Sequence, residues 1–452
     1  MNNKTPVIRI FSITLLLLIL LVACGIGNDA AVSNPITDQL REEVRPLLLA
    51  DFDLLVAEVE ANMPLSGVFY RRFGIELSSH FADMREHIVA TNAFGQNAEN
   101  IDQMERAAAE FLFAYLRSKI EKEFAGVGHF WPMPHDWYTG HLVEYMKIMA
   151  VEENAKYRHI TENYEVFSNP AALWFYDVDM NELDLEDNLL GMYENDPNNI
   201  RTWVDPQGEV AWIRIKHAFN YLDFDRDKLF SFYEEIQEYP HLIIDIRGHR
   251  GGYTSHFHEL IMRPLLTAPV HVQMHTFYMD GEHVQKSFEH IAEIQKSLLA
   301  EMISATLDYY DAAEYISSNN MTEFNPQDME KLAYVDVSSA EIIPLENGFP
   351  FYGKIWVLTD HNTASAGEAA VLMTMSSGFA TVVGTPTAGI MPSATSFVLL
   401  PNTGIIVRMD ISYFTDALGR SLEEFGIIPD IPNRTGMDAE QTVLALIAEW
   451  NN

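Results

Sequence analysis

The chain has 452 residues, 48% hydrophobic and 21% charged, which is the balance of a globular protein with a large core. Its 65 Asp and Glu outnumber 29 Lys and Arg, giving a formal net charge of −36. A nucleic-acid partner, which needs a basic surface, is therefore not expected. The single cysteine excludes an internal disulfide framework and a thiolate-rich metal site.

The N-terminus has the pattern of an export signal. Lys4 and Arg9 precede an apolar run over residues 10–23, which is too short for a comfortable membrane span. Leu-Val-Ala closes the run directly before Cys24, and this resembles the bacterial lipobox, in which the cysteine becomes the lipidated N-terminus. An ordinary signal peptide or a short anchor with an incidental cysteine is the alternative.

Cleavage before Cys24 would leave 27 basic and 65 acidic residues, a formal net charge of −38. Anionic lipid headgroups repel such a surface, so acyl chains rather than a basic patch would hold the protein at the membrane. We expect a signal peptide over residues 1–23, a lipid anchor at Cys24 and a tether over residues 24–37. The body of the protein would then lie in the cell envelope, outside the cytoplasmic membrane.

Helical periodicity dominates the next part of the chain. Apolar residues recur every three or four positions over residues 38–62 and 101–124, and the second helix closes at Gly126. We expect a helical N-terminal domain over residues 38–130. Residues 131–207 are rich in aromatic side chains and interrupted by an acidic stretch, so we expect an irregular connecting region there.

From residue 208 the pattern changes to strands that alternate with helices. Crossover helices between strands are typical of an α/β core with parallel pairing, which we place at residues 208–452. The expected strands are 210–216, 242–246, 354–359, 381–383, 396–400 and 405–409, and the expected helices are 226–237, 255–266, 290–315, 364–375 and 438–450.

The most informative segment joins the strand over 354–359 to the following helix. It places Ser365 at the first helical turn, where a serine can act as a nucleophile. The Ala366 amide lies at the same helix N-terminus, which favours an anion such as the oxyanion of acyl transfer. Ser365 and Glu368 also have the S-x-x-E spacing of a capping box, so a helix cap without chemistry is the alternative.

A second strand, over residues 242–246, ends in a turn that closes with Gly251 and Gly252. Glycine lets the backbone approach a ligand closely, so this turn could supply another amide to an oxyanion. Two strand ends, one with a serine and one with glycine amides, could form both halves of an acyl-transfer site.

Four segments in this order resemble the C-terminal-processing (tail-specific) serine peptidases and their tricorn-like relatives. Leu242–Gly252 looks like the family's strand and glycine turn, and Thr363–Glu368 is similar to its nucleophile motif. Phe379–Gly389 and Glu423–Asp430 resemble its two later signatures. The resemblance implies a ClpP/crotonase-like α/β spiral core of mixed sheet and crossover helices, preceded by the helical domain.

The resemblance also assigns roles to residues. It implies Ser365 as the nucleophile, the Ala366 amide as one oxyanion donor, and an amide of Gly251 or Gly252 as the other. The processing peptidases place a general-base lysine just after the third segment, where this chain has Ile390. A serine–lysine dyad is therefore not expected.

The tricorn-like branch instead uses a histidine from an N-terminal segment and a glutamate near the last signature. Residues 126–130, Gly-Val-Gly-His-Phe, are similar to that histidine element. We therefore expect His129 as the general base and Glu423 as the residue that orients or polarises the base. His141, and His249 inside the glycine turn, are the alternatives.

Other signals are weak. The acidic stretch that begins at Asp177 lacks the turn glycine and the closing glutamate of a calcium loop. His256 and His258 lack the spacing of zinc ligands, so neither a metal nor another cofactor is expected.

The leading function is a membrane-anchored serine peptidase that acts on peptide or protein substrates through an acyl-enzyme. A non-catalytic peptide- or ligand-binding lipoprotein, and hydrolysis of a non-peptide ester or amide, are the alternatives.

Overall fold

The structure is a computed structural model, and it describes residues 34–124, 126–150, 158–183, 199–216, 222–294, 305–392 and 395–450. The expected signal peptide, Cys24 and most of the tether lie outside these residues. Among the residues that are described, none of the helices combines the length and the apolar character needed to cross a membrane.

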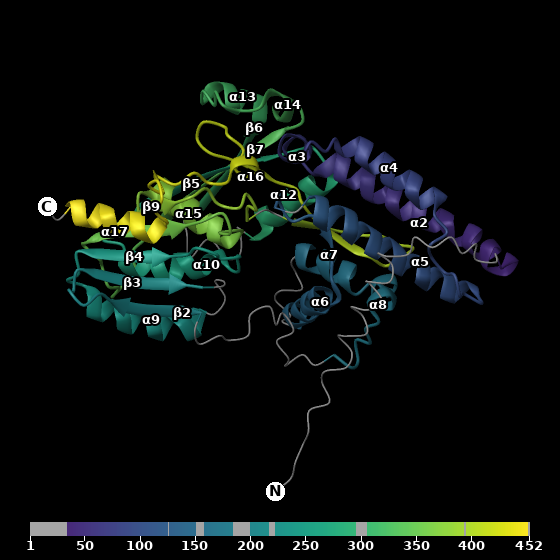
Figure 1. Ribbon diagram of the computed structural model, residues 1–452, viewed down its shortest axis with the longest axis horizontal. Coiled ribbons are helices and arrows are strands. Elements are labelled where there is room, and N and C mark those ends of the chain that lie inside the picture. Colours follow the sequence, from purple (N-terminus) through teal and green to yellow (C-terminus); the bar gives the residue numbers. More distant parts are fainter. Residues whose placement is uncertain are drawn as a thin grey trace, which may run out of the picture.

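The N-terminal part is a bundle of helices, as predicted. They are α2 (Pro35–Asn62), α3 (Ser66–Phe73), α4 (Leu77–Ala90) and α5 (Ile101–Leu116), with a π-helical turn, η1 (Arg117–Glu121), after α5. The side chain of Asn34 caps α2 by accepting the amide of Ile36, and Val44, Leu48 and Phe52 bury one face of that helix. Figure 1 shows α2, α4 and α5 lying side by side at one end of the molecule.

Residues 131–207 are more regular than we expected. Their described parts contain α6 (His135–Met149), α7 (Arg158–Phe167) and α8 (Pro170–Tyr176). The aromatic side chains that obscure the sequence pattern form the packing between these helices. Tyr138 stacks on Tyr176 with 3.9 Å between the ring centroids, and its hydroxyl donates a hydrogen bond to the carbonyl of Phe167.

A six-stranded sheet forms the core, and its order is β13-β9-β8-β4-β3-β2. All neighbours are parallel except β2 and β3, so the predicted α/β core is confirmed. Leu242 and Ile244 face α9, whereas Ile243 faces α17 on the opposite side, so helices cover both faces (Figure 1). The elements are β2 (Ile200–Val204), β3 (Val210–Ile215), β4 (His241–Asp245), β8 (Lys354–Thr359), β9 (Thr381–Gly384), β13 (Ile431–Pro432), α9 (Leu222–Ile236), α15 (Ala366–Ser377) and α17 (Ala439–Trp450).

Two antiparallel sheets complete the described part of the fold, in the orders β12-β5-β7-β6 and β1-β11-β10. Their strands are β5 (Val270–Tyr278), β6 (Ala305–Asp311), β7 (Tyr334–Ile342), β12 (Tyr413–Thr415), β1 (Trp131–Pro132), β10 (Thr395–Leu399) and β11 (Ile406–Asp410). The remaining helices are α10 (Thr254–Phe257), η4 (His258–Met262), α11 (Arg263–Leu265), α12 (Glu282–Ile294), α13 (Ala312–Ser318), α14 (Pro326–Met329) and α16 (Leu422–Phe425).

The predicted helix over residues 290–315 is wrong. α12 ends at Ile294, and Ala305–Asp311 form the strand β6, which pairs with β7 along its whole length. The apolar spacing of this segment suits a helix, but pairing with a long neighbouring strand overrides that local preference.

The short strand β1 joins the helical part to the core. Trp131 and Pro132 pair with Arg408 and Val407 of β11, which belongs to the C-terminal hairpin. This pairing places the segment that contains His129 against residues almost three hundred positions later in the chain.

Candidate active site

The two strand ends that we expected to form a site are adjacent. β4 and β8 are parallel neighbours, so the chain leaves both strands at the same edge of the sheet. The hydroxyl of Thr363 donates to the carbonyl of Ile246 at 3.1 Å, and the Ala364 amide donates to the carbonyl of His249 at 2.8 Å. These bonds fix the loop before Ser365 against the glycine turn.

Ser365 has a strained backbone and a free hydroxyl. Its φ is 54° and its ψ is −121°, which is unfavourable for a residue with a side chain. Its amide donates to the carbonyl of Ile390 at 2.6 Å, which holds the residue in this conformation. Its hydroxyl makes no capping bond to α15 and no other hydrogen bond among the described residues, so the capping-box alternative is not formed. Strain of this kind at a half-buried serine is typical of a nucleophile.

Gly251 lies directly against this serine. A Cβ atom at Gly251 would lie 2.9 Å from the Ser365 Cβ and 3.2 Å from its Oγ, and the Gly251 φ is +124°. Only glycine fits there.

The backbone amides of Ala366 and Gly251 differ in whether they are free to donate to an oxyanion. The Ala366 amide begins α15 and has no acceptor among the described residues, so it can donate to an oxyanion. The Gly251 amide donates to His249 Nδ1 at 3.3 Å, so it becomes available only when that bond breaks.

Glu368 faces the interior, one turn beyond the serine. It is fully buried, and its Oε1 accepts the Gly389 amide at 2.9 Å and the hydroxyl of Thr387. Burial raises the pKa of this carboxyl to about 7. Its contacts tie α15 to the loop that carries Ile390.

His129 is held by an aspartate that the sequence analysis did not identify. Asp410, at the end of β11, accepts the His129 amide at 2.6 Å, and its two oxygens lie 3.1 and 3.2 Å from His129 Nδ1. A Cβ atom at Gly128 would lie 2.7 Å from Asp410 Oδ2, so the carboxylate fills the space that a side chain before His129 would need. The polar residue that closes the apolar strand I-V-R-M-D is the one sequence signal for Asp410.

Glu423 does not bond His129 in the described residues. Its buried carboxyl accepts the Phe414 amide at 2.8 Å and the hydroxyl of Ser421 at 3.3 Å. Burial first, and then the charge of Asp410, raise the pKa of Glu423 well above its ordinary value. Glu423 therefore lies near Asp410 and stabilises α16, whereas Asp410 makes the contact that orients His129.

Arg72, in α3, bonds the segment that carries His129 and the helix that carries Glu423. Its guanidinium donates to the carbonyl of Gly126 at 2.5 Å and to the carbonyl of Glu423 at 2.8 Å. It thereby holds the start of the His129 segment against α16.

The other candidate bases, His141 and His249, are both packed into the interior of the protein. His141 packs between Phe167 and Phe397, with centroid distances of 5.5 and 5.6 Å. Burial lowers its pKa to about 4, so the ring is neutral near pH 7. His249 is fully buried beneath the glycine turn.

A cavity of about 550 Å³ connects the His129 segment to the surroundings of Ser365. Gly128 and Phe130, on either side of His129, line it together with Ile390, whose carbonyl holds the Ser365 amide. The His129 ring packs against Trp131, which also lines the cavity, with 5.3 Å between centroids. The lining thus contains residues next to His129 and the residue that holds Ser365, although no hydrogen bond joins Ser365 and His129 in the described residues. No group of three or more described His, Cys, Asp or Glu side chains is arranged to bind a metal.

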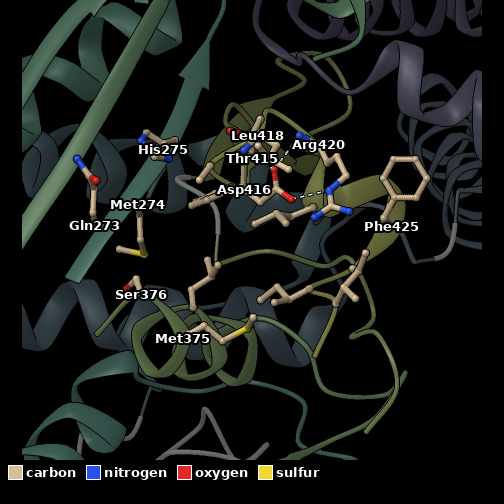
Figure 2. Close-up of a pocket in the computed structure, with 17 residues that line it drawn as sticks. Gln273, Met274, His275, Met375, Ser376, Thr415, Asp416, Leu418, Arg420 and Phe425 are labelled. Carbon is tan, nitrogen blue, oxygen red and sulfur yellow. Dashed lines mark hydrogen bonds and ion pairs between the residues drawn. The ribbon is translucent and has the colours of Figure 1, made fainter. Parts of the chain in front are cut away.

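A second cavity, of about 480 Å³, lies at the far end of α15 and is shown in Figure 2. Met375 and Ser376 line it on one side. Asp416 and Arg420 lie across from them and form an ion pair, with 2.6 Å between Arg420 Nε and Asp416 Oδ2. None of the predicted site residues lines this cavity.

Comparison with known proteins assigns the family. Residues 209–433 match the model of peptidase family S41. This part of the chain belongs to that family. The chain is accordingly a hydrolase of the serine-peptidase class, and peptides or proteins are the substrates of a peptidase. The match includes the glycine turn, Ser365 and Glu423, and it begins after His129.

Solved structures with similar folds include mature CPAF, at 11% identity and a TM-score of 0.49, over 90% of this chain and 96% of that chain. The photosystem II D1 C-terminal processing protease is 11% identical with a TM-score of 0.38, over 88% of this chain and 97% of that one. A lipoprotein from Streptococcus agalactiae is 10% identical with a TM-score of 0.38, over 93% and 99% of the two chains. No curated protein sequence matches. At these identities and TM-scores, the assignment rests on the family match.

Proposed function

We propose that this chain is an active peptidase of the tricorn-like, lysine-free branch, with Ser365 as nucleophile and His129 as general base. The observation that carries the proposal is the strained Ser365, whose hydroxyl is free, beside the free Ala366 amide. The pair of His129 and Asp410 supports the choice of base, because Gly128 and Phe130, on either side of His129, line the same cavity as Ile390, whose carbonyl accepts the Ser365 amide.

Asp410 determines which nitrogen of His129 can accept a proton. An ionised carboxylate only accepts hydrogen bonds, so the nitrogen that faces Asp410, Nδ1, carries the ring proton. Nε2 then has a free lone pair and can act as the base. Asp410 is a positioning residue, since it acts through His129.

The reaction follows from these roles. His129 Nε2 takes the Ser365 hydroxyl proton as Oγ attacks the peptide carbonyl, and the Ala366 amide stabilises the oxyanion that forms. The imidazolium returns the proton to the leaving amine, which breaks the peptide bond and leaves an acyl-enzyme. Water, deprotonated by the same imidazole, then hydrolyses the ester and regenerates Ser365.

The missing hydrogen bond between Ser365 and His129 means that the two side chains must approach each other when substrate binds. Such catalytic hydrogen bonds are often long in free enzymes and shorten in the substrate complex.

A fluorophosphonate probe tests this proposal. The purified mature domain should be labelled, Ser365→Ala should abolish labelling, and Ser376→Ala, a control in the same helix, should be labelled like the wild type. Labelling that persists in Ser365→Ala removes this residue from the role of nucleophile.

A non-catalytic peptide-binding protein on the same scaffold is the second candidate. The engagement of the Gly251 amide by His249 favours it, because an occupied amide is not available to an oxyanion. A wild type that binds peptides yet is not labelled would support this function.

We also propose that the protein is a lipoprotein anchored through Cys24, with its catalytic part in the cell envelope. The basic start, the apolar run and the small residues before the cysteine support this location. Radiolabelled palmitate should be incorporated by the wild type in bacterial cells but not by Cys24→Ala. Equal incorporation by both proteins would refute the anchor.

A further inference from the structure

Arg250 is an exposed arginine at the active site without a carboxylate partner. It directly precedes Gly251, which lies against Ser365, and it lines the cavity of about 550 Å³ together with Gly128 and Phe130, on either side of His129. Its side chain makes no hydrogen bond or ion pair with any residue that the structure describes. The absence of a partner is notable in a chain with 65 acidic and 29 basic residues.

Two other arginines, Arg247 and Arg420, are paired with carboxylates. Arg247, three positions earlier, bonds Asp245 at 2.8 Å. Arg420, at the cavity of Figure 2, bonds Asp416 at 2.6 Å and is therefore neutralised locally. Arg250 is left as a free cation that faces the place where substrate must bind.

The walls of the cavity are aromatic. Trp131 and Trp137 meet edge to face with 6.2 Å between their centroids, and the guanidinium of Arg408 lies 5.4 and 5.9 Å from the two rings. This packing fixes the two rings as a rigid apolar surface. The one other charged residue of the lining, Glu121, is bonded to Arg117 at 2.7 Å.

We propose that this cavity is a substrate subsite in which Arg250 binds a carboxylate next to the scissile bond, while the tryptophans hold a large apolar side chain. The subsite rests on the proposed peptidase function and specifies its substrates. Guanidinium groups bind carboxylates through paired hydrogen bonds. An extended peptide advances by about 3.3 Å per residue, so the carboxylate must lie within about two residues of the cleaved bond.

The carboxylate can be an Asp or Glu side chain or the C-terminal main-chain group of the substrate. Both offer the same chemistry to Arg250. Synthetic decapeptides of varied sequence, prepared once with free and once with amidated C-termini, separate the two sources. Their cleavage positions are read by mass spectrometry after digestion by wild type, Arg250→Gln, Arg250→Lys and the control Arg420→Gln.

The wild type should cleave preferentially within two residues of a carboxylate. Arg250→Gln should lower that preference roughly tenfold, because one charge-assisted interaction is lost, and should leave the cleavage of peptides without carboxylates unchanged. Arg250→Lys should restore part of the preference, and Arg420→Gln should behave like the wild type. A preference that survives amidation identifies acidic side chains, and one that disappears identifies the C-terminus.

Equal cleavage profiles for the wild type and Arg250→Gln would overturn the subsite while leaving the peptidase in place. Equal rates of fluorophosphonate labelling at Ser365 verify that the catalytic groups of each variant are intact. A wild type that neither reacts with the probe nor cleaves peptides refutes the peptidase function, and the subsite with it.

Discussion

Replacing Asp410 by asparagine tests the geometry of the catalytic base. The carboxylate accepts both the His129 amide, at 2.6 Å, and Nδ1, at 3.1 Å. Asparagine has one oxygen and one NH₂ group, so it places a donor where one of the two carboxylate oxygens now lies, 3.1 or 3.2 Å from Nδ1. If its oxygen stays with the backbone amide, its NH₂ group faces Nδ1 and favours the tautomer with the proton on Nε2, which cannot accept the Ser365 proton.

We expect Asp410→Asn to lower kcat by roughly 10³- to 10⁴-fold, as loss of the correct tautomer does in serine peptidases. This corresponds to about 4 to 5.5 kcal/mol of transition-state stabilisation. KM should change little, since the cavity walls are retained. Peptide hydrolysis at several substrate concentrations separates the two constants.

Asp51 provides a matched control for this substitution. It is fully buried and accepts the amides of Asn402 and Thr403, far from His129 in its contacts. Asp51→Asn should lower the free energy of unfolding without a comparable loss of kcat. A kcat for Asp410→Asn within about threefold of the wild type would refute the assignment of Asp410 as the positioning residue.

Three further substitutions test neighbouring contacts. Gly128→Ala places a Cβ 2.7 Å from Asp410 Oδ2, so peptide hydrolysis should fall as in Asp410→Asn. The free energy of unfolding measured in urea should fall by about 1–3 kcal/mol. Unchanged hydrolysis would show that the added Cβ does not displace Asp410. Gly251→Ala places a Cβ 2.9 Å from the Ser365 Cβ, so fluorophosphonate labelling should slow at least roughly 100-fold, and labelling at the wild-type rate would show that the contact is absent. Burial raises the pKa of Glu368 from 4.5 to about 7, so its neutral form contributes stability below pH 4.5 that is lost as the pH rises through 7. Glu368→Gln should remove about 3 kcal/mol of the pH dependence of the free energy of unfolding, measured in urea. The same pH dependence in the wild type and the variant would show that burial does not raise the pKa of Glu368.

The adjacency of the nucleophile and the glycine turn could be predicted because it follows from local patterns. The strands over 242–246 and 354–359 are short and apolar, and parallel neighbours end at the same edge of a sheet. The serine and glycine residues that follow them must then meet. The strain at Ser365 could not be predicted, because the carbonyl that holds it belongs to Ile390, on another loop.

The partner of His129 could not be predicted from the sequence for a related reason. Asp410 lies 281 positions later, and it reaches His129 only because β1 pairs with β11. Neither strand pairing nor register can be derived from a two-residue strand. The resemblance suggested Glu423 instead, whose carboxyl is occupied by the Phe414 amide.

Intact-protein mass spectrometry of fluorophosphonate labelling tests the central claim most directly, namely that His129 activates Ser365. Wild type and His141→Ala should each gain one adduct, mapped to the peptide that contains Ser365, at the same rate. His129→Ala should react at least roughly 10³-fold more slowly, and Ser365→Ala should not react at all. Equal rates for His129→Ala and the wild type would contradict the account.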